Sequence, residues 1–155
     1  MATSIIDGII EEAHLKRSFW NMRVFDPVLI RRTDGQVENL GKNIVEGHLA
    51  EHIVPGAAGR FYRYTAVDHR GIHGVRLDNG EEGYGFARNN EIASIACIML
   101  GVVLFAFYLL TGTVVTSWMW LILPIGLVGL PLYWSARAAA WRQYAGDEAP
   151  LHPSR

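Results

Sequence analysis

The chain has little of several features that would otherwise classify it. It has one cysteine, Cys97, so an intramolecular disulfide is impossible and the cysteine count says nothing about the redox compartment. Its formal net charge is −1, which lacks the basic excess typical of nucleic-acid-binding domains. Residues 1–15 contain Asp7, Glu11 and Glu12 where a signal peptide needs an apolar core. We therefore expect neither a nucleic-acid partner nor a secretory signal.

The most informative absence is that of charge between residues 92 and 136. No Asp, Glu, Lys, Arg or His occurs there, although charged residues make up 19% of the whole chain. A helix needs roughly 20 apolar residues to cross a bilayer, so this stretch is long enough to cross twice. Polar and small residues at 111–113 divide it. We predict transmembrane spans at about 92–110 and 114–134.

Basic residues indicate how these spans are oriented. The short connection between the spans has no Lys or Arg, whereas Arg88 and Arg137 lie just outside the pair. Positive charge accumulates on the cytoplasmic side of membrane proteins. We therefore expect a two-span integral membrane protein with both termini in the cytoplasm, as in a bacterial inner membrane.

Residues 1–89 carry strand patterns and two tight-turn signals. The Asp-Gly pair at 34–35 and the Asn-Gly pair at 79–80 each predict a two-residue hairpin loop, because these residues tolerate positive φ. A further strand is predicted at 60–67 from its aromatic and β-branched residues. Two-residue loops would place Arg31 opposite Glu38, Leu29 opposite Leu40, Val75 opposite Tyr84 and His73 opposite Phe86. The prediction is a compact five-stranded β unit, in the form of a small barrel.

Two helices are predicted within the same region. Ser4 and Asp7 have capping-box spacing, and the isoleucines at positions 5–10 fall on one helical face. This helix would either pack on its own domain or lie on the membrane surface, anchored by the basic and aromatic residues of 16–20. A second, short helix is predicted from Asn43 to Val54, with Asn43 as its N-cap.

The segment His48-Leu49-Ala50-Glu51-His52 resembles the H-x-x-E-H pattern of inverzincin metallopeptidases, over these five residues only. The resemblance implies that His48 and His52 bind zinc, because residues four apart share a helix face, and that Glu51 is the general base. The third ligand, a carboxylate on a later helix, has no candidate where the chain is predicted to form strands. The alternative is a pair of histidines on a packing helix. We predict no bound metal and no cofactor.

Two other clusters have ordinary structural explanations. Asp68, His69 and His73 lie in or beside a predicted hairpin loop, where Asp serves the turn itself. The run Arg60–Tyr64 alternates cations with aromatics, as platforms for single-stranded nucleic acid do. Ring burial and packing of the Arg stems account for that pattern.

Small residues recur along both predicted spans. Ala93, Cys97 and Gly101 repeat every four residues, and Gly126 and Gly129 are similarly placed in the second span. Such a face allows close helix approach. It serves either the packing of the two spans on each other or assembly with a second copy or a larger membrane protein. No charged side chain lies in either span, which argues against an ion pathway.

These patterns predict an α+β fold in three parts. Residues 1–89 form a five-stranded β domain with an N-terminal helix and one inserted short helix. Residues 90–135 form a transmembrane helical hairpin, and residues 136–155 a helix extension with a disordered tail. We expect a non-enzymatic, membrane-anchored binding or accessory protein. The alternatives are a membrane-bound metal-dependent hydrolase centred on the H-x-x-E-H motif and a small subunit of a channel or transport complex.

Overall fold

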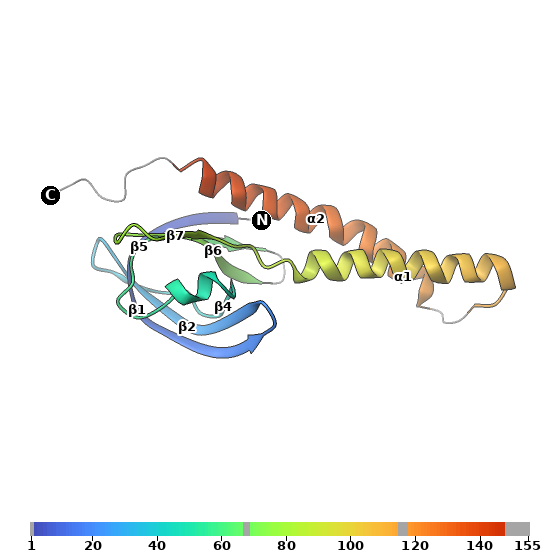
Figure 1. Cartoon of the computed structure of the whole chain (residues 1–155), viewed down its shortest axis with the longest axis horizontal. Coiled ribbons are helices and arrows are strands. Elements are labelled where there is room, and N and C mark those ends of the chain that lie inside the picture. Colours follow the sequence, from blue (N-terminus) through green and yellow to red (C-terminus); the bar gives the residue numbers. More distant parts are fainter. Residues whose placement is uncertain (1, 67–68, 115–117, 148–155) are drawn as a thin grey trace. The chain divides into compact units, whose positions relative to one another are not determined.

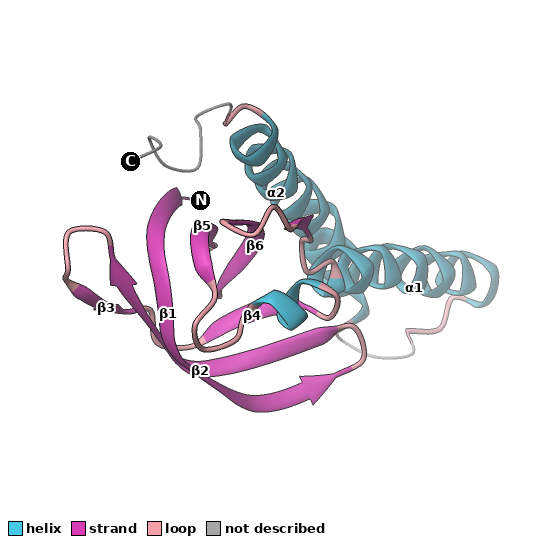
Figure 2. Cartoon of the chain, turned by 60° about the vertical axis from the view of Figure 1, so that its left-hand side comes forward, coloured by secondary structure: helices cyan, strands magenta, loops and turns pink. Residues whose placement is uncertain are grey.

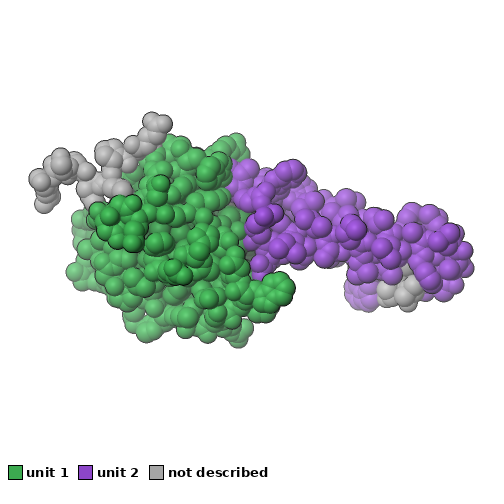
Figure 3. Space-filling view, viewed as in Figure 1, with its two compact units in different colours: residues 1–87, 139–155 green, residues 88–138 purple. Residues whose placement is uncertain are grey.

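The computed structural model describes residues 2–66, 69–114 and 118–147. It separates the chain into two compact units, coloured separately in Figure 3. One unit comprises residues 1–87 and 139–155, and the other comprises residues 88–138. The first holds the β-strands, and the second holds most of two long helices (Figure 1). The predicted α+β class, a small β domain followed by two apolar helices, is confirmed.

Five strands of the first unit close into a barrel (Figure 2). Their bounds are β1 Ala2–Phe19, β2 Met22–Arg32, β4 Asn43–Glu46, β5 Ala58–Thr65 and β6 Arg70–Leu77. The order is β1-β5-β6-β4-β2, and pairing of β1 with β2 closes the ring. Strands β4 and β6 are parallel, and the other pairs within the ring are antiparallel. This five-stranded arrangement is the topology of the oligonucleotide/oligosaccharide-binding (OB) fold.

Three short elements complete the unit. Strand β3 (Val37–Asn39) pairs with β2, strand β7 (Glu82–Tyr84) pairs with β6, and the 3₁₀ helix η1 (Leu49–His52) follows β4. The second strands of the two predicted hairpins are therefore short arms outside the ring. The five-stranded barrel is confirmed, but two of its strands differ from the predicted ones. Strands β1 and β4 take the places in the ring that were predicted for the second strands of the two hairpins.

The barrel interior is filled by aliphatic and aromatic side chains from every strand of the ring. These residues are Ile6, Ile10, Phe25, Val28, Ile30, Leu40, Val45, Leu49, Ile53, Phe61, Ile72, Val75 and Leu77. Each is nearly inaccessible to solvent. Burial of this apolar surface is the main force that stabilises the barrel.

The predicted N-terminal helix is wrong, because this segment is the longest strand, β1. Ile6 and Ile10 are buried, whereas Ile5 and Ile9 are 40% and 47% exposed, which is the period of a strand. Adjacent isoleucines fit a helical face and a strand face equally, and β-branched side chains favour the strand. Gly8 pairs with β2 on one side and with β5 on the other. Backbone hydrogen bonds to two neighbouring strands therefore favour the strand over the helix.

The predicted helix from Asn43 to Val54 is also wrong over most of its length. Residues 43–46 form β4, and only the single 3₁₀ turn of η1 remains helical. The buried Asn43 side chain donates its amide to the Leu40 and Gly41 carbonyls, at 3.2 and 3.0 Å, and so holds a turn before the strand. The parallel pairing of β4 with β6 closes the barrel and overrides local propensity.

Both predicted hairpin registers are wrong by one residue. Arg31 pairs with Val37 and Val75 with Gly83, instead of with Glu38 and Tyr84. Each loop has three residues, because Arg32 N–H bonds to Gln36 and Leu77 N–H bonds to Glu81. In both loops the third residue is a glycine with positive φ, at 84° and 88°. This is the common three-residue hairpin loop, and it shifts the whole pairing by one position.

Two helices are long and apolar enough to cross a membrane, by length and composition. Helix α1 spans Asn89–Thr111 and helix α2 spans Met119–Ala145. The predicted helix extension beyond residue 136 is present as the last part of α2. Residues 139–147 belong to the same compact unit as the barrel. The predicted disordered tail falls almost entirely on residues 148–155, which lie outside the described part.

Candidate functional site

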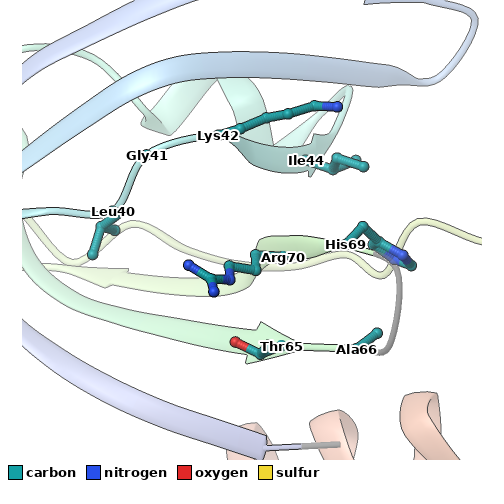
Figure 4. Close-up of a pocket in the computed structure, with 8 residues that line it drawn as sticks. All are labelled: Leu40, Gly41, Lys42, Ile44, Thr65, Ala66, His69 and Arg70. Atoms are coloured by element: carbon teal, nitrogen blue, oxygen red, sulfur yellow. The ribbon is translucent and has the colours of Figure 1, made fainter.

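An open groove of about 450 Å³ lies on the barrel surface and is the leading candidate for a binding site (Figure 4). It is bounded by the connection between β3 and β4, the end of β5 and the start of β6. Its lining residues are Leu40, Gly41, Lys42, Ile44, Thr65, Ala66, His69 and Arg70. The groove therefore joins segments that lie up to thirty residues apart in the sequence, which explains why no local motif reveals it.

The groove is cationic. Lys42 and Arg70 are both exposed, and no ion pair joins either to an acidic side chain among the residues that the structure describes. None of the eight lining residues is acidic. The Thr65 hydroxyl adds a neutral hydrogen-bonding group, and the His69 ring packs edge-on against Tyr64, with centroids 5.4 Å apart. This arrangement can hold an anionic group.

The histidines of the H-x-x-E-H motif do not share an α-helical face. Residues 49–52 form a 3₁₀ turn, in which residues four apart point roughly 120° away from each other. His48 Nε2 lies 3.1 Å from the Tyr84 carbonyl oxygen, and His52 Nδ1 lies 3.4 Å from a Glu81 carboxylate oxygen. Each imidazole thus has its own partner on the loop or strand opposite.

A zinc site needs at least three converging ligands. Within residues 2–66, 69–114 and 118–147, no group of three or more His, Cys, Asp or Glu side chains is placed to hold a metal ion. The second histidine cluster is likewise divided. His69 lines the groove, His73 is buried in the barrel unit, and Asp68 lies outside the described residues.

The C-terminal segment 139–147 is bound to the barrel by a charge network. Arg60, only 9% exposed, donates to Asp7 at 2.7 Å and to Asp147 at 3.0 Å. The Tyr62 hydroxyl also donates to Asp147, at 2.8 Å. The hydrogen bond to Asp7 is the main cause that raises the pKa of Arg60. The Arg60 guanidinium and the Tyr62 hydroxyl donate their hydrogen bonds to carboxylates of the same chain. The network therefore joins the segment to the barrel and does not form an open binding site.

Aromatic rings form the rest of this contact. The Tyr144 ring lies 5.0 Å from that of Tyr62 and 5.3 Å from that of Tyr84, and it packs on the Arg76 guanidinium at 4.9 Å. Burial raises the pKa of Tyr62, so this phenol stays protonated at neutral pH and is not a nucleophile. The cluster is structural, and the sequence pattern Arg60–Tyr64 is explained by it.

His73 lies beneath the same cluster and is fully buried. Its ring is surrounded by those of Tyr62, Tyr64 and Tyr84, with centroids at 6.2, 5.8 and 6.0 Å. Burial lowers the pKa of His73 to about 4, and the Ala140 backbone only partly offsets this effect. His73 is therefore neutral at physiological pH and acts as a core side chain.

In the helical unit, three of the predicted small residues lie at contacts between α1 and α2. A Cβ at Gly101 would lie 2.7 Å from the Leu123 side chain, and one at Gly126 would lie 2.7 Å from the Ser94 carbonyl. A Cβ at Gly129 would lie 2.7 Å from Ser94 Oγ. These glycines allow the two helices of one chain to approach closely.

The remaining two residues of that predicted face are placed differently. Ala93 is exposed and Cys97 is partly buried. The buried face of α1 instead carries Glu91, which the sequence reasoning did not single out. Its carboxylate pairs with Arg137 of α2 at 3.1 Å and with Arg88 at 3.3 Å, so it joins the two helices at one end of the hairpin.

No protein-family model, no curated protein and no solved structure matches this chain.

Proposed function

We propose that this chain is a non-enzymatic, membrane-anchored binding protein. Its two apolar helices hold the barrel at the cytoplasmic face of a membrane, and the cationic groove binds an acidic segment of a partner protein. The observation that carries the proposal is the groove itself, whose cations Lys42 and Arg70 have no acidic partner within the described chain.

Membrane anchoring is supported by the surface of the two helices. Large apolar side chains on α1 and α2 are exposed, with values of 60% at Val103, 87% at Leu110 and 55% at Leu127. A soluble protein rarely exposes apolar surface of this extent. A lipid bilayer would cover it, and the charge-free connection with flanking arginines favours cytoplasmic termini.

The groove favours a protein partner over nucleic acid. OB-fold barrels commonly bind ligands on the second and third ring strands and the loops beside them. Here those strands are β2 and β4, and the groove lies beside β4; this is an argument by analogy of fold. A platform for single-stranded nucleic acid needs exposed aromatic rings. On β2 and β4 the one aromatic is Phe25, which is 6% exposed. The exposed rings of Phe19 and Trp20 lie on the turn between β1 and β2 and do not line the groove.

Site-specific photocrosslinking in intact membranes tests the proposal. A photoreactive residue at Thr65 should capture a defined protein through the groove. Lys42→Glu combined with Arg70→Glu should abolish that adduct, since two attractive contacts become repulsive. Arg32→Glu is the matched control, because Arg32 is an exposed cation elsewhere on the barrel, paired with Glu38.

The adduct supports the proposal only if it survives in the Arg32→Glu control and disappears in the groove variant. An adduct that is equal in both variants, or no adduct in any membrane preparation, would contradict it. Recovery of crosslinked nucleic acid at this position would identify the groove as a different kind of site.

A further inference from the structure

The turn between β1 and β2 exposes an aromatic pair that the fold does not use. Trp20 is 90% exposed and Phe19 is 61% exposed, and their rings stack with centroids 6.3 Å apart. Leu15, on the same hairpin, is 55% exposed. The stacked rings of Phe19 and Trp20 form the apolar tip of the barrel, and Leu15 lies further along β1, where it pairs with Phe25.

Folding alone would not favour tryptophan at this turn. Trp20 has φ of 46°, the left-handed region that glycine and asparagine adopt most readily. A bulky residue there costs about 1 kcal/mol, and the exposed ring recovers little of that cost by packing. The position therefore carries a side chain suited to contact with something outside this chain.

Contacts within the barrel unit hold the β1–β2 turn beside the segment that leads out of that unit. Asn21 donates to the Glu46 carboxylate at 2.8 Å, and its carbonyl accepts from Gly47 N–H at 2.7 Å. Glu46 in turn packs on Gly85, where a Cβ would lie 2.6 Å from its carboxylate oxygen. Helix α1 begins four residues later, at Asn89. Four residues span at most about 14 Å, so the membrane surface is within reach of the tip.

Basic side chains outnumber acidic ones around the tip, where Asp26 and Glu46 are the acidic side chains in contact with the hairpin. Residues 15–24 include Lys16, Arg17 and Arg23 and no acidic residue. Lys16 is paired with Asp26 at 2.7 Å, whereas Arg17 is exposed and has no acidic partner in the described chain. Exposed aromatics bordered by arginines are typical of segments that lie at the headgroup level of an anionic leaflet.

We infer that the Phe19–Trp20 tip inserts into the headgroup region of the cytoplasmic leaflet. It is a second contact of the barrel with lipid, in addition to the two spanning helices. It would fix the orientation of the barrel and of its groove at the membrane surface. This inference rests on the proposed anchoring of α1 and α2 in a bilayer.

The test uses the full chain in vesicles that contain anionic lipid. Cys97→Ser removes the native thiol, and a single new cysteine carries an environment-sensitive fluorophore. Ser18→Cys reports on the tip while leaving both aromatic rings in place. Asp34→Cys is the matched control, because it is an exposed hairpin turn at the opposite end of β2. Val103→Cys reports on α1.

Lipid-attached quenchers placed at headgroup depth should quench the label at position 18 several-fold more strongly than the label at 34. Adding Phe19→Ala and Trp20→Ala should remove that difference. Equal, weak quenching at 18 and 34 with strong quenching at 103 by deep quenchers would overturn the inference but not the anchoring.

Two further outcomes are distinct. No quenching at 103 would overturn the anchoring by α1, and with it the inference. Protection of position 18 from a water-soluble quencher, without quenching by lipid probes, would mean that a protein or a second copy covers the tip. That result would overturn the assignment to lipid.

Discussion

At the residue scale, the buried His73 predicts how stability depends on pH. Its pKa is about 4 in the folded protein, against an ordinary value of 6.5, because burial disfavours the charged ring. The unfolded chain therefore binds this proton more readily. The stabilisation is complete above about pH 6.5 and is lost as pH falls towards 4. Between pH 7.5 and 5 we expect a loss of about 2 kcal/mol, measured as reduced resistance of the barrel to denaturant.

A pair of variants separates this effect from general acid sensitivity. His73→Phe keeps a ring among the tyrosines and should flatten the pH dependence between 7.5 and 5. In the control His69→Phe the loss caused by His73 should persist, because His73 is intact. Equal pH dependence in both variants and in the parent protein would show that His73 is not the responsible group.

The paired histidines of the H-x-x-E-H motif lead to a prediction about metal. Because His48 and His52 have separate partners, we predict that the purified protein binds no stoichiometric zinc. Elemental analysis after purification without chelators measures this. One equivalent of zinc that disappears in His48→Ala or His52→Ala would contradict it and revive the hydrolase alternative.

Single residues also explain why the sequence did not predict the register of the two hairpins. The Asp-Gly and Asn-Gly signals located both turns correctly, but loop length depends on whether one more residue joins the loop. Thr33 and Asp78 do so, and each register shifts by one position. Turn composition predicts where a hairpin reverses more reliably than which residues face each other.

At the scale of elements, the last turns of α2 should stabilise the barrel. Tyr144→Ala removes the ring that packs on Tyr62, Tyr84 and Arg76, and should cost roughly 3 kcal/mol. Denaturant unfolding of the detergent-solubilised protein, followed by near-UV circular dichroism, measures the loss.

Tyr144→Phe is the matched variant, since it retains the ring and should lose far less. We expect residues 1–89 to fold on their own, but with lower stability for the same reason. A fragment without residues 139–147 exposes this aromatic cluster, so it should melt at a lower temperature than the full chain. Equal stability of fragment and full chain would show that the segment contributes nothing.

The packing of α1 on α2 should depend on Gly101. A leucine there would clash with Leu123, so Gly101→Leu should force the helices apart and lower thermal stability by an amount equivalent to about 1–3 kcal/mol. Val102→Leu enlarges a neighbouring side chain that is 52% exposed, and should be neutral. Fluorescence-detected size exclusion after heating measures both variants.

The same experiment addresses assembly, which is the second use that the small-residue face allows. If the hairpin also joins copies, Gly101→Leu should lower the oligomeric mass, and oxidative cross-linking through Cys97 in membranes should yield a dimer. An unchanged mass with lowered stability would restrict Gly101 to the packing of helices within one chain. A monomer under all conditions, with Gly101→Leu fully stable, would exclude both uses.

The secondary structure of some elements could be predicted from their own sequence, and that of others could not. The charge-free stretch predicted both long helices. The bounds of α1 lie within three residues of the predicted span, whereas α2 begins five residues later than predicted and continues to Ala145. The segments that became β1 and β4 were predicted as helices, because adjacent isoleucines and a capping asparagine fit both periodicities. Their strand form comes from pairing partners distant in the chain, which local patterns do not reveal.

At the scale of the whole molecule, we propose that two spanning helices anchor a small barrel at the cytoplasmic face. The sequence predicted the order of the parts but not the groove, since Lys42, Thr65 and Arg70 are brought together only by barrel closure. Nor did it predict that residues 139–147 belong to the barrel unit. The chain thus enters the helical unit from the barrel and returns to it.

Reporter fusions in living cells test the proposed topology. A reporter that is active only outside the cytoplasm should be active when inserted at Thr113, between the helices, and inactive when fused after Arg155. A reporter that is active only inside should give the opposite pattern. If the fusion at Thr113 reports the inside and the fusion after Arg155 the outside, or if both report the same side, the account of a cytoplasmic barrel on a two-span anchor is contradicted.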